Sequence, residues 1–196
     1  MKHSLPGRPG SHAGSRSVLG RAVISGTVGG LAAAAAASLA GKREDDHYAA
    51  PLNATSHIIW GEEAAHQDKP SLKYTLTGFL LNHASAIFWA LFYEKLLGRG
   101  ESRADQGGLH PKNWNEGPSH DSSKIASRAR PMLQPILDAA AVTAAAYVTD
   151  YYLIPKRFTP GFEKRLSGKS LSAVFVALAA GLAARDVIRA TKAPRK

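Results

Sequence analysis

Four apolar blocks, separated by polar stretches, limit the folds open to this chain of 196 residues. The blocks cover about residues 22–40, 74–95, 132–154 and 171–188. Each is about as long as the run of roughly 20 mostly apolar residues that an α-helix needs to cross a bilayer. The mean hydropathy of −0.18 hides this pattern because polar residues fill the gaps. The blocks predict an all-α fold, an integral membrane bundle of four transmembrane helices.

A water-soluble bundle of alanine-rich helices is the main alternative for the fold. Such a helix needs a charged outer face, with apolar residues recurring every three or four positions. Residues 22–40 and 74–93 offer no charged face, so water would contact bare alanine, leucine and phenylalanine side chains. The membrane interpretation is therefore favoured.

The first block also has some properties of a cleaved signal peptide. Three arginines precede it, and it ends in Ser38-Leu39-Ala40, an acceptable cleavage pattern. The leader is long, however, and the apolar stretch exceeds a typical signal core. A retained span is favoured, and in either case the residues after Ala40 emerge on the far side of the membrane.

The distribution of lysine and arginine predicts the topology, because cytoplasmic loops carry an excess of both. The segment before the first span, the loop 95–130 and the C-terminal tail are rich in them, whereas six acids outnumber the four basic residues of the loop 41–73. Both termini are therefore expected in the cytoplasm. The basic loop 156–169 lies outside in this arrangement, against the rule. A net charge of +10 fits lipid headgroups, and no nucleic-acid-binding module is recognisable.

Composition divides the chain into a membrane domain and polar segments. Residues 1–17 are expected to be a disordered cytoplasmic tail, residues 18–190 the four-helix membrane domain, and residues 191–196 a cytoplasmic tail. The stretch 98–130 has the composition of a flexible cytoplasmic linker. Residues 50–60 mix turn formers with Ile58, Ile59 and Trp60, as a segment at the membrane interface would.

Small residues recur every fourth position in two of the predicted spans. Such faces allow helices to approach closely in lipid, where there is no hydrophobic drive to bring them together. Chance spacing in alanine-rich helices is an equally good explanation. The predicted helix-packing positions are Gly26, Gly30 and Ala34 in the first span and Ala173, Ala177 and Gly181 in the fourth.

Polar side chains inside the second and third spans form a candidate intramembrane site. Asn82 and His83 lie well inside the second span, and Tyr147 and Asp150 share a face of the third. Because ionisable groups in hydrocarbon are costly, they are functional candidates by default. We expect His83 and Asp150 to meet, directly or through water, although an orienting hydrogen bond explains the pair nearly as well as a functional one.

No enzymatic motif is recognisable in the chain. The absence of cysteine excludes thiolate catalysis and cysteine-based metal sites. His57, Glu62, Glu63 and His66 share the predicted outer loop, but their spacing matches no known metal motif. No cofactor is expected. A periplasm-facing metal enzyme is the weakest of the functional hypotheses.

Three segments resemble those of uncharacterised small four-span bacterial inner-membrane proteins: APLNATSHIIWG (50–61), LNHASAIFWALFYEKLLG (81–98) and DYYLIPKRFTPGFE (150–163). The resemblance covers about residues 18–190 and implies a bacterial inner membrane but no activity. We expect a non-enzymatic structural or partner-binding component that contacts the lipid bilayer and forms homo-oligomers or binds other membrane proteins. The alternative is a small proton- or ion-coupled permease using His83 and Asp150.

Overall fold

A computed structural model describes residues 17–107 and 122–192, and within these ranges it contains helices and no strands. The four long helices are α1 (Val18–Asp45), α4 (Thr77–Gly107), α5 (Ser122–Val148) and α6 (Gly168–Lys192). The short elements are α2 (Ala50–Thr55), α3 (His57–Trp60), η1 (Glu62–His66), η2 (Leu72–Leu76), η3 (Thr149–Leu153), η4 (Lys156–Phe158) and η5 (Phe162–Lys164).

Three of the long helices are long and apolar enough to cross a membrane. They are α1, the continuous helix over Leu72–Leu96, and α6. The described part of α5 is not among them, so three of the four expected spans are supported. The three apolar helices indicate a membrane-associated protein, and the all-helical fold agrees with the prediction.

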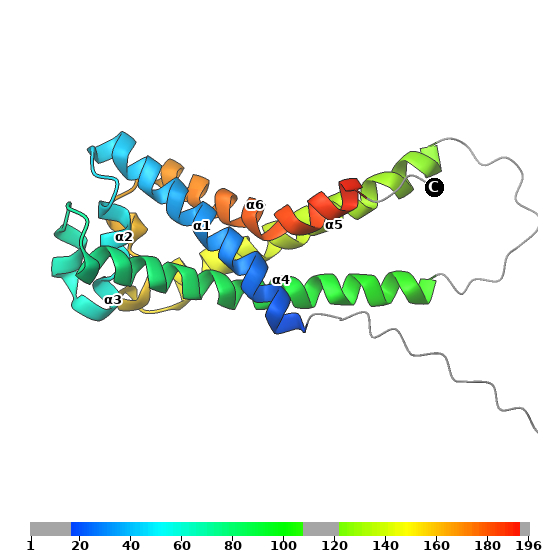
Figure 1. Cartoon of the computed structure of the whole chain (residues 1–196), viewed down its shortest axis with the longest axis horizontal. Helices are drawn as coiled ribbons and strands as arrows, with labels where there is room; N and C mark the ends of the chain where they lie inside the picture. The colour runs from blue at the N-terminus through cyan, green and yellow to red at the C-terminus, as the bar shows by residue number, and fades with distance from the viewer. Residues whose placement is uncertain (1–16, 108–121, 193–196) are drawn as a thin grey trace, which may run out of the picture.

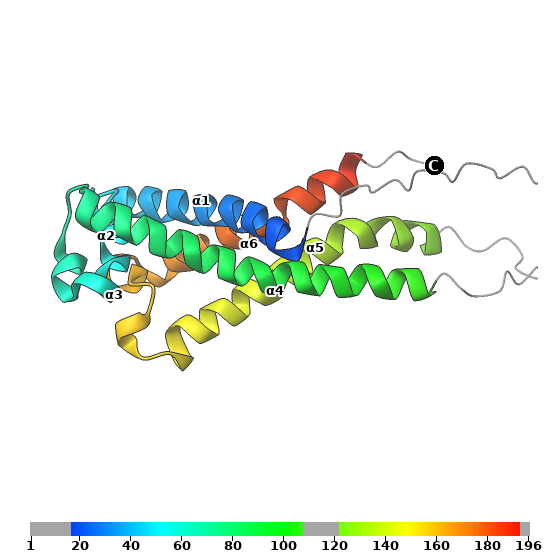
Figure 2. The same cartoon turned by 60° about the horizontal axis from the view of Figure 1, so that its bottom comes forward.

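The long helices run alternately up and down, and the short elements collect at one end (Figures 1 and 2). Helix α1 packs between α4 and α6, α5 packs on the other side of α6, and a looser contact of α5 with α4 closes the ring. We call residues 46–71 and 154–167 the cap. The opposite end of the bundle, where α1 begins and α6 ends, is the terminal end.

The backbone of α1 lies in close contact with both α4 and α6 because glycine residues lie at each of these two contacts. A Cβ atom on Gly26 would lie 2.5 Å from the Cα of Ile87 in α4. A Cβ atom on Gly181 of α6 would lie 2.5 Å from the Cα of Gly29 in α1. The two faces of one helix therefore hold α4 and α6 in place.

The cap, which contains the predicted interfacial segment 50–60, is folded against the end of the bundle. All six residues of α2 are buried, whereas Ile59 and Trp60 are exposed. A Cβ atom on Gly78 would fall 1.7 Å from the carbonyl oxygen of Leu52, so α4 begins in direct contact with the α2 backbone. Asn53 is fully buried; its amide donates to the carbonyls of Gln67 and Lys69, and its oxygen accepts from Thr75.

The predicted linker 98–130 is helical over much of its length, which corrects that expectation. Helix α4 continues to Gly107 and α5 begins at Ser122. The remaining residues, 108–121, lie outside the described part, as do 1–16 and 193–196 of the predicted tails.

Candidate functional site

A cavity of about 390 Å³ lies between α4, α6 and the cap, with Ala33 of α1 among its lining residues. Five aromatic side chains from three parts of the fold line it: Phe88 and Trp89 from α4, Phe158 and Phe162 from the cap, and Phe175 from α6. The polar lining consists of Thr55, Asn82, Ser85 and Asp150. The cavity is therefore mostly apolar, with several aromatic rings and a few convergent polar groups, as small-molecule sites commonly are.

Asp150 is the charged residue among those that line the cavity, within the described part of the chain. It belongs to η3, the π-helical turn that follows α5, and is partly buried. No hydrogen bond or ion pair to its carboxylate occurs among the described residues. A partly buried carboxylate with no protein donor is available to a ligand.

Asn82 lines the same cavity, but its amide is already used in packing. Its Nδ2 atom donates to the carbonyl oxygen of Gly30, at 3.0 Å. This hydrogen bond joins α4 to α1 in the middle of the bundle. Asn82 is thus both a lining residue and a link between helices.

His83 lies on a different face of α4, directed at α1. Its Nε2 atom is 3.3 Å from Oγ1 of Thr27, and its ring stacks on Phe79 with centroids 5.8 Å apart. No hydrogen bond or ion pair joins His83 to Asp150, so the expected direct contact is not formed. Consecutive residues of a helix point about 100° apart, and here Asn82, not its neighbour, faces the cavity.

Tyr147 lies beside the cavity without lining it. Its ring packs edge-on against Phe175, with centroids 5.2 Å apart, and in a tilted arrangement against Tyr151, with centroids 5.1 Å apart. It also lines a separate apolar groove between α5 and α6. Of the four predicted site residues, the structure places Asn82 and Asp150 in one cavity and leaves His83 and Tyr147 outside it.

The predicted small-residue positions fall into two groups. Gly26, Gly30 and Ala34 are buried in α1; Gly26 and Gly30 face α4, where the nearest atoms belong to Ile87, Ala86 and His83. Gly181 is buried against α1, but Ala177 is only partly buried and Ala173 is exposed. The row in α6 therefore packs within the bundle at Gly181 and not at Ala173.

A buried ionic cluster at the terminal end escaped sequence analysis. The Glu94 side chain is 1% exposed and accepts from Arg21 Nε at 2.9 Å, Ser25 Oγ at 2.5 Å and Arg185 Nη2 at 2.8 Å. Arg185 also pairs with Asp186, which accepts from the hydroxyl of Tyr93. In the sequence, the charged residues of this cluster appear only as separate charges at the ends of different spans. The predicted topology places all of these charges at the same depth, and this shared depth is the feature of the sequence that could have indicated the cluster.

The basic loop 156–169 is paired with acids at the end of α1 and in the other cap loop. Lys164 contacts Glu62 at 2.7 Å, and this hydrogen bond holds the pKa of Glu62 below its ordinary value. Arg165 contacts Asp45 at 2.6 Å and also Asp68. Ser167 donates from its amide and its hydroxyl to Glu44. Local acids therefore pair with two of the five positive charges that break the topology rule, Lys164 and Arg165.

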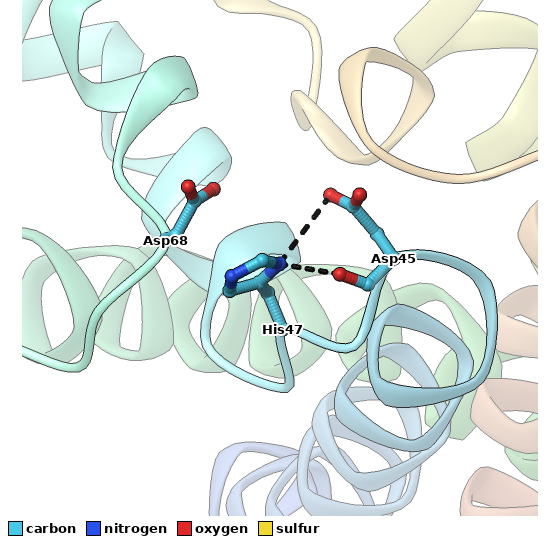
Figure 3. A group of neighbouring side chains, drawn as sticks. All are labelled: Asp45, His47 and Asp68. Carbon is cyan, nitrogen blue, oxygen red and sulfur yellow. Dashed lines mark hydrogen bonds and ion pairs between the residues drawn. The ribbon is translucent and has the colours of Figure 1, made fainter.

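Asp45, His47 and Asp68 place ligand-type atoms within 4.8 Å of one another, the closest approach to a metal-binding group among the described residues. Figure 3 shows the three side chains directed toward a common space, with His47 contacting Asp45. The guanidinium of Arg165 already bridges both carboxylates. The group therefore ties the cap loops together, and a cation already occupies the position a metal would need.

The four cap residues considered for the metal-enzyme hypothesis are dispersed in the structure. His57 is buried, and its Nδ1 atom contacts the carbonyl of Ala54. Glu62 is paired with Lys164, Glu63 accepts from the hydroxyl of Tyr74, and His66 contacts its own helix backbone. These four residues form no ligand group in the described part of the chain.

Comparison with known proteins provides no further assignment. No family model, no curated protein and no solved structure matches the chain. The functional argument therefore rests on the geometry alone.

Proposed function

We propose that this chain is an integral protein of a bacterial inner membrane, crossed by all four long helices, with both termini in the cytoplasm and the cap outside. Within it, the chain is a binding component and not an enzyme. The observation that supports this proposal is the apolar surface of the bundle between its two polar ends.

Exposed apolar side chains occur on every long helix, including α5. Leu31 of α1, Leu80 of α4, Leu137 of α5 and Val176 of α6 are each about half exposed or more, and Val176 reaches 68%. In water this surface would be costly to solvate, whereas in hydrocarbon it needs no partner. The ionic cluster around Glu94 at one end and the ion pairs of the cap at the other bound this apolar surface.

Binding is favoured over catalysis by the chemistry of the cavity. Among the described residues, its lining contains one carboxylate and several aromatic rings but no second acid or base beside Asp150. General acid–base catalysis requires such groups within hydrogen-bonding reach. A permease that passes protons between His83 and Asp150 would need the two side chains to meet, directly or through water, and no direct hydrogen bond or ion pair joins them.

The test is topology, with reporter fusions at Ala50, Gly108, Gly168 and the C-terminus of the full chain. The expected locations are outside, inside, outside and inside. Reporters at Gly108 and Gly168 on the same side would mean that α5 does not cross, which would overturn the four-span proposal. Four cytoplasmic reporters and a protein released from membranes by alkaline carbonate would overturn the membrane proposal as a whole.

A further inference from the structure

We propose that the cavity beside Asp150 binds a monovalent organic cation with an apolar or aromatic body, and that Asp150 is its counter-ion. This inference rests on the proposed binding function and names the ligand class of the same site. Three observations support it: the charge of the lining, its aromatic character and its size.

The charge of the lining selects a cation. Asp150 is the charged lining residue in the described part of the chain, and no lysine, arginine or histidine lines the cavity. The carboxylate also lacks a hydrogen-bond donor from the described residues. A carboxylate removed from water must pair with a cation or take up a proton. A ligand ammonium group would supply the missing charge, and a ligand anion would meet repulsion.

The aromatic lining favours an organic cation over a hydrated metal ion. Phe88, Trp89 and Phe175 lie on two helices, with Phe158 and Phe162 completing the lining from the cap. The faces of aromatic rings attract ammonium groups, and cages of such rings recognise quaternary ammonium ligands. They provide no oxygen ligands, whereas a hard metal ion takes six or more. Thr55, Asn82 and Ser85 are too few to replace a hydration shell.

The volume of the cavity fits a small molecule of this class. About 390 Å³ is within the range of ligand pockets and is large enough for a phenyl ring with a trimethylammonium group. The apolar part of the lining, including Leu81, Val174 and Leu178, would contact the body of the ligand. A suitable probe is therefore benzyltrimethylammonium, with neopentylbenzene as a neutral control of the same shape.

The experiment uses the full-length protein in detergent and follows the fluorescence of Trp89. The chain has three tryptophans, so Trp60→Phe and Trp114→Phe leave Trp89, a lining residue, as the sole reporter. We expect saturable changes with benzyltrimethylammonium, and Asp150→Asn should weaken its binding by about tenfold to a hundredfold. Asp150→Glu, which keeps the charge, should retain most of the affinity. Neopentylbenzene should bind equally to the parent and Asp150→Asn proteins.

Asp138→Asn is the matched control. Asp138 lies on α5, does not line the cavity and accepts from Gln134 at 2.8 Å. Its replacement should change the affinity for the probe by less than about twofold, as expected for a site with no ligand contact. Equal affinity of the Asp150→Asn and parent proteins for the cation would overturn the inference. So would displacement of the probe by millimolar KCl, which would identify a site for inorganic ions.

The topology reporters separate this outcome from failure of the proposed function. A four-span protein that does not bind the probe contradicts the organic-cation inference alone. A chain that is not embedded in the membrane contradicts the proposed function as well. If Asp150→Asn does not fold, the comparison of the charged and neutral probes on the parent protein still decides whether the site selects positive charge.

Discussion

The Nη2 atom of Arg185 lies 2.8 Å from one carboxylate oxygen of Glu94 and 3.0 Å from the other. The Arg21 guanidinium contacts the same carboxylate from α1, so one acid connects three helices. A charge buried to this extent is tolerated only when other groups compensate it. Glu94 therefore makes the terminal end of the bundle depend on α1, α4 and α6 together.

Glu94→Gln should destabilise the folded protein by about 3 kcal/mol, because two guanidinium groups lose the negative charge that they share. Reversible unfolding in mixed detergent micelles measures this change. Asp46→Asn is the control, since it removes an exposed i,i+4 pair with Lys42 and should leave the unfolding midpoint unchanged. An equal effect of the two substitutions would show that burial does not strengthen the Glu94 interactions.

Gly181→Ala should also destabilise the protein, by about 1–3 kcal/mol, because the new methyl group collides with the α1 backbone. The added Cβ atom would lie 2.8 Å from the Gly29 nitrogen and 2.9 Å from the Val28 oxygen, and backbone atoms cannot move aside easily. Gly20→Ala is the matched control, because its nearest neighbour would be Ser17 Oγ at 3.5 Å. It should leave stability unchanged or raise it slightly through helix propensity. The melting temperatures of the two variants in detergent test this difference.

Asn53→Ala should loosen the cap, because two backbone carbonyls lose their donor and Thr75 loses its acceptor. Leaving buried polar groups without partners costs about 1–3 kcal/mol. We expect faster hydrogen exchange over residues 64–71, measured by mass spectrometry, with the exchange of α6 unchanged. Uniformly faster exchange would mean instead that the cap and the bundle unfold as one unit.

The Lys164–Glu62 pair should make the stability of the cap depend on acid pH. Because Lys164 lowers the pKa of Glu62 in the folded state, the stabilisation is present above the ordinary value of 4.5. It is lost as the pH falls from there through the lowered folded value. Lys164→Gln should therefore melt below the parent protein at pH 6 and approach it near pH 3.

Lys169→Gln removes the same charge from the same loop, and no ion pair involving Lys169 is seen among the described residues. Its melting temperature should follow that of the parent protein at each pH. A pH-dependent difference between the parent and Lys169→Gln would mean that general charge, not the Glu62 contact, causes the effect.

The sequence predicted the helices of the fold better than it predicted which residues each helix contacts. Long charge-free runs such as 22–40 require helices wherever they are, so the helical fold and the alternation of helices followed directly. The extension of α4 beyond residue 95 could not be predicted in this way, because the end of an apolar block does not end a helix. The burial of α2 depends on Gly78, more than 20 residues away, and local composition carries no sign of that contact.

The candidate site was predicted in part, for a geometric reason. Spacing along a helix shows which residues share a face but not which neighbour that face contacts. Asn82 and His83 were both placed in the second span, and both contact α1, but only the packed structure shows that Asn82 also lines the cavity and His83 does not. Glu94 was missed because its partners come from the beginning and the end of the chain.

The order of the cap loops along the chain has a consequence for biogenesis in the proposed topology. The loop that contains Asp45, Glu62 and Asp68 is synthesised before Lys164 and Arg165, so the acidic loop reaches the outer side first. The later loop must carry its positive charges across the membrane against the usual bias. There the later loop meets the acids that have already crossed, and ion pairs between the two loops would hinder its return. These ion pairs would therefore favour insertion of α6 in the correct orientation.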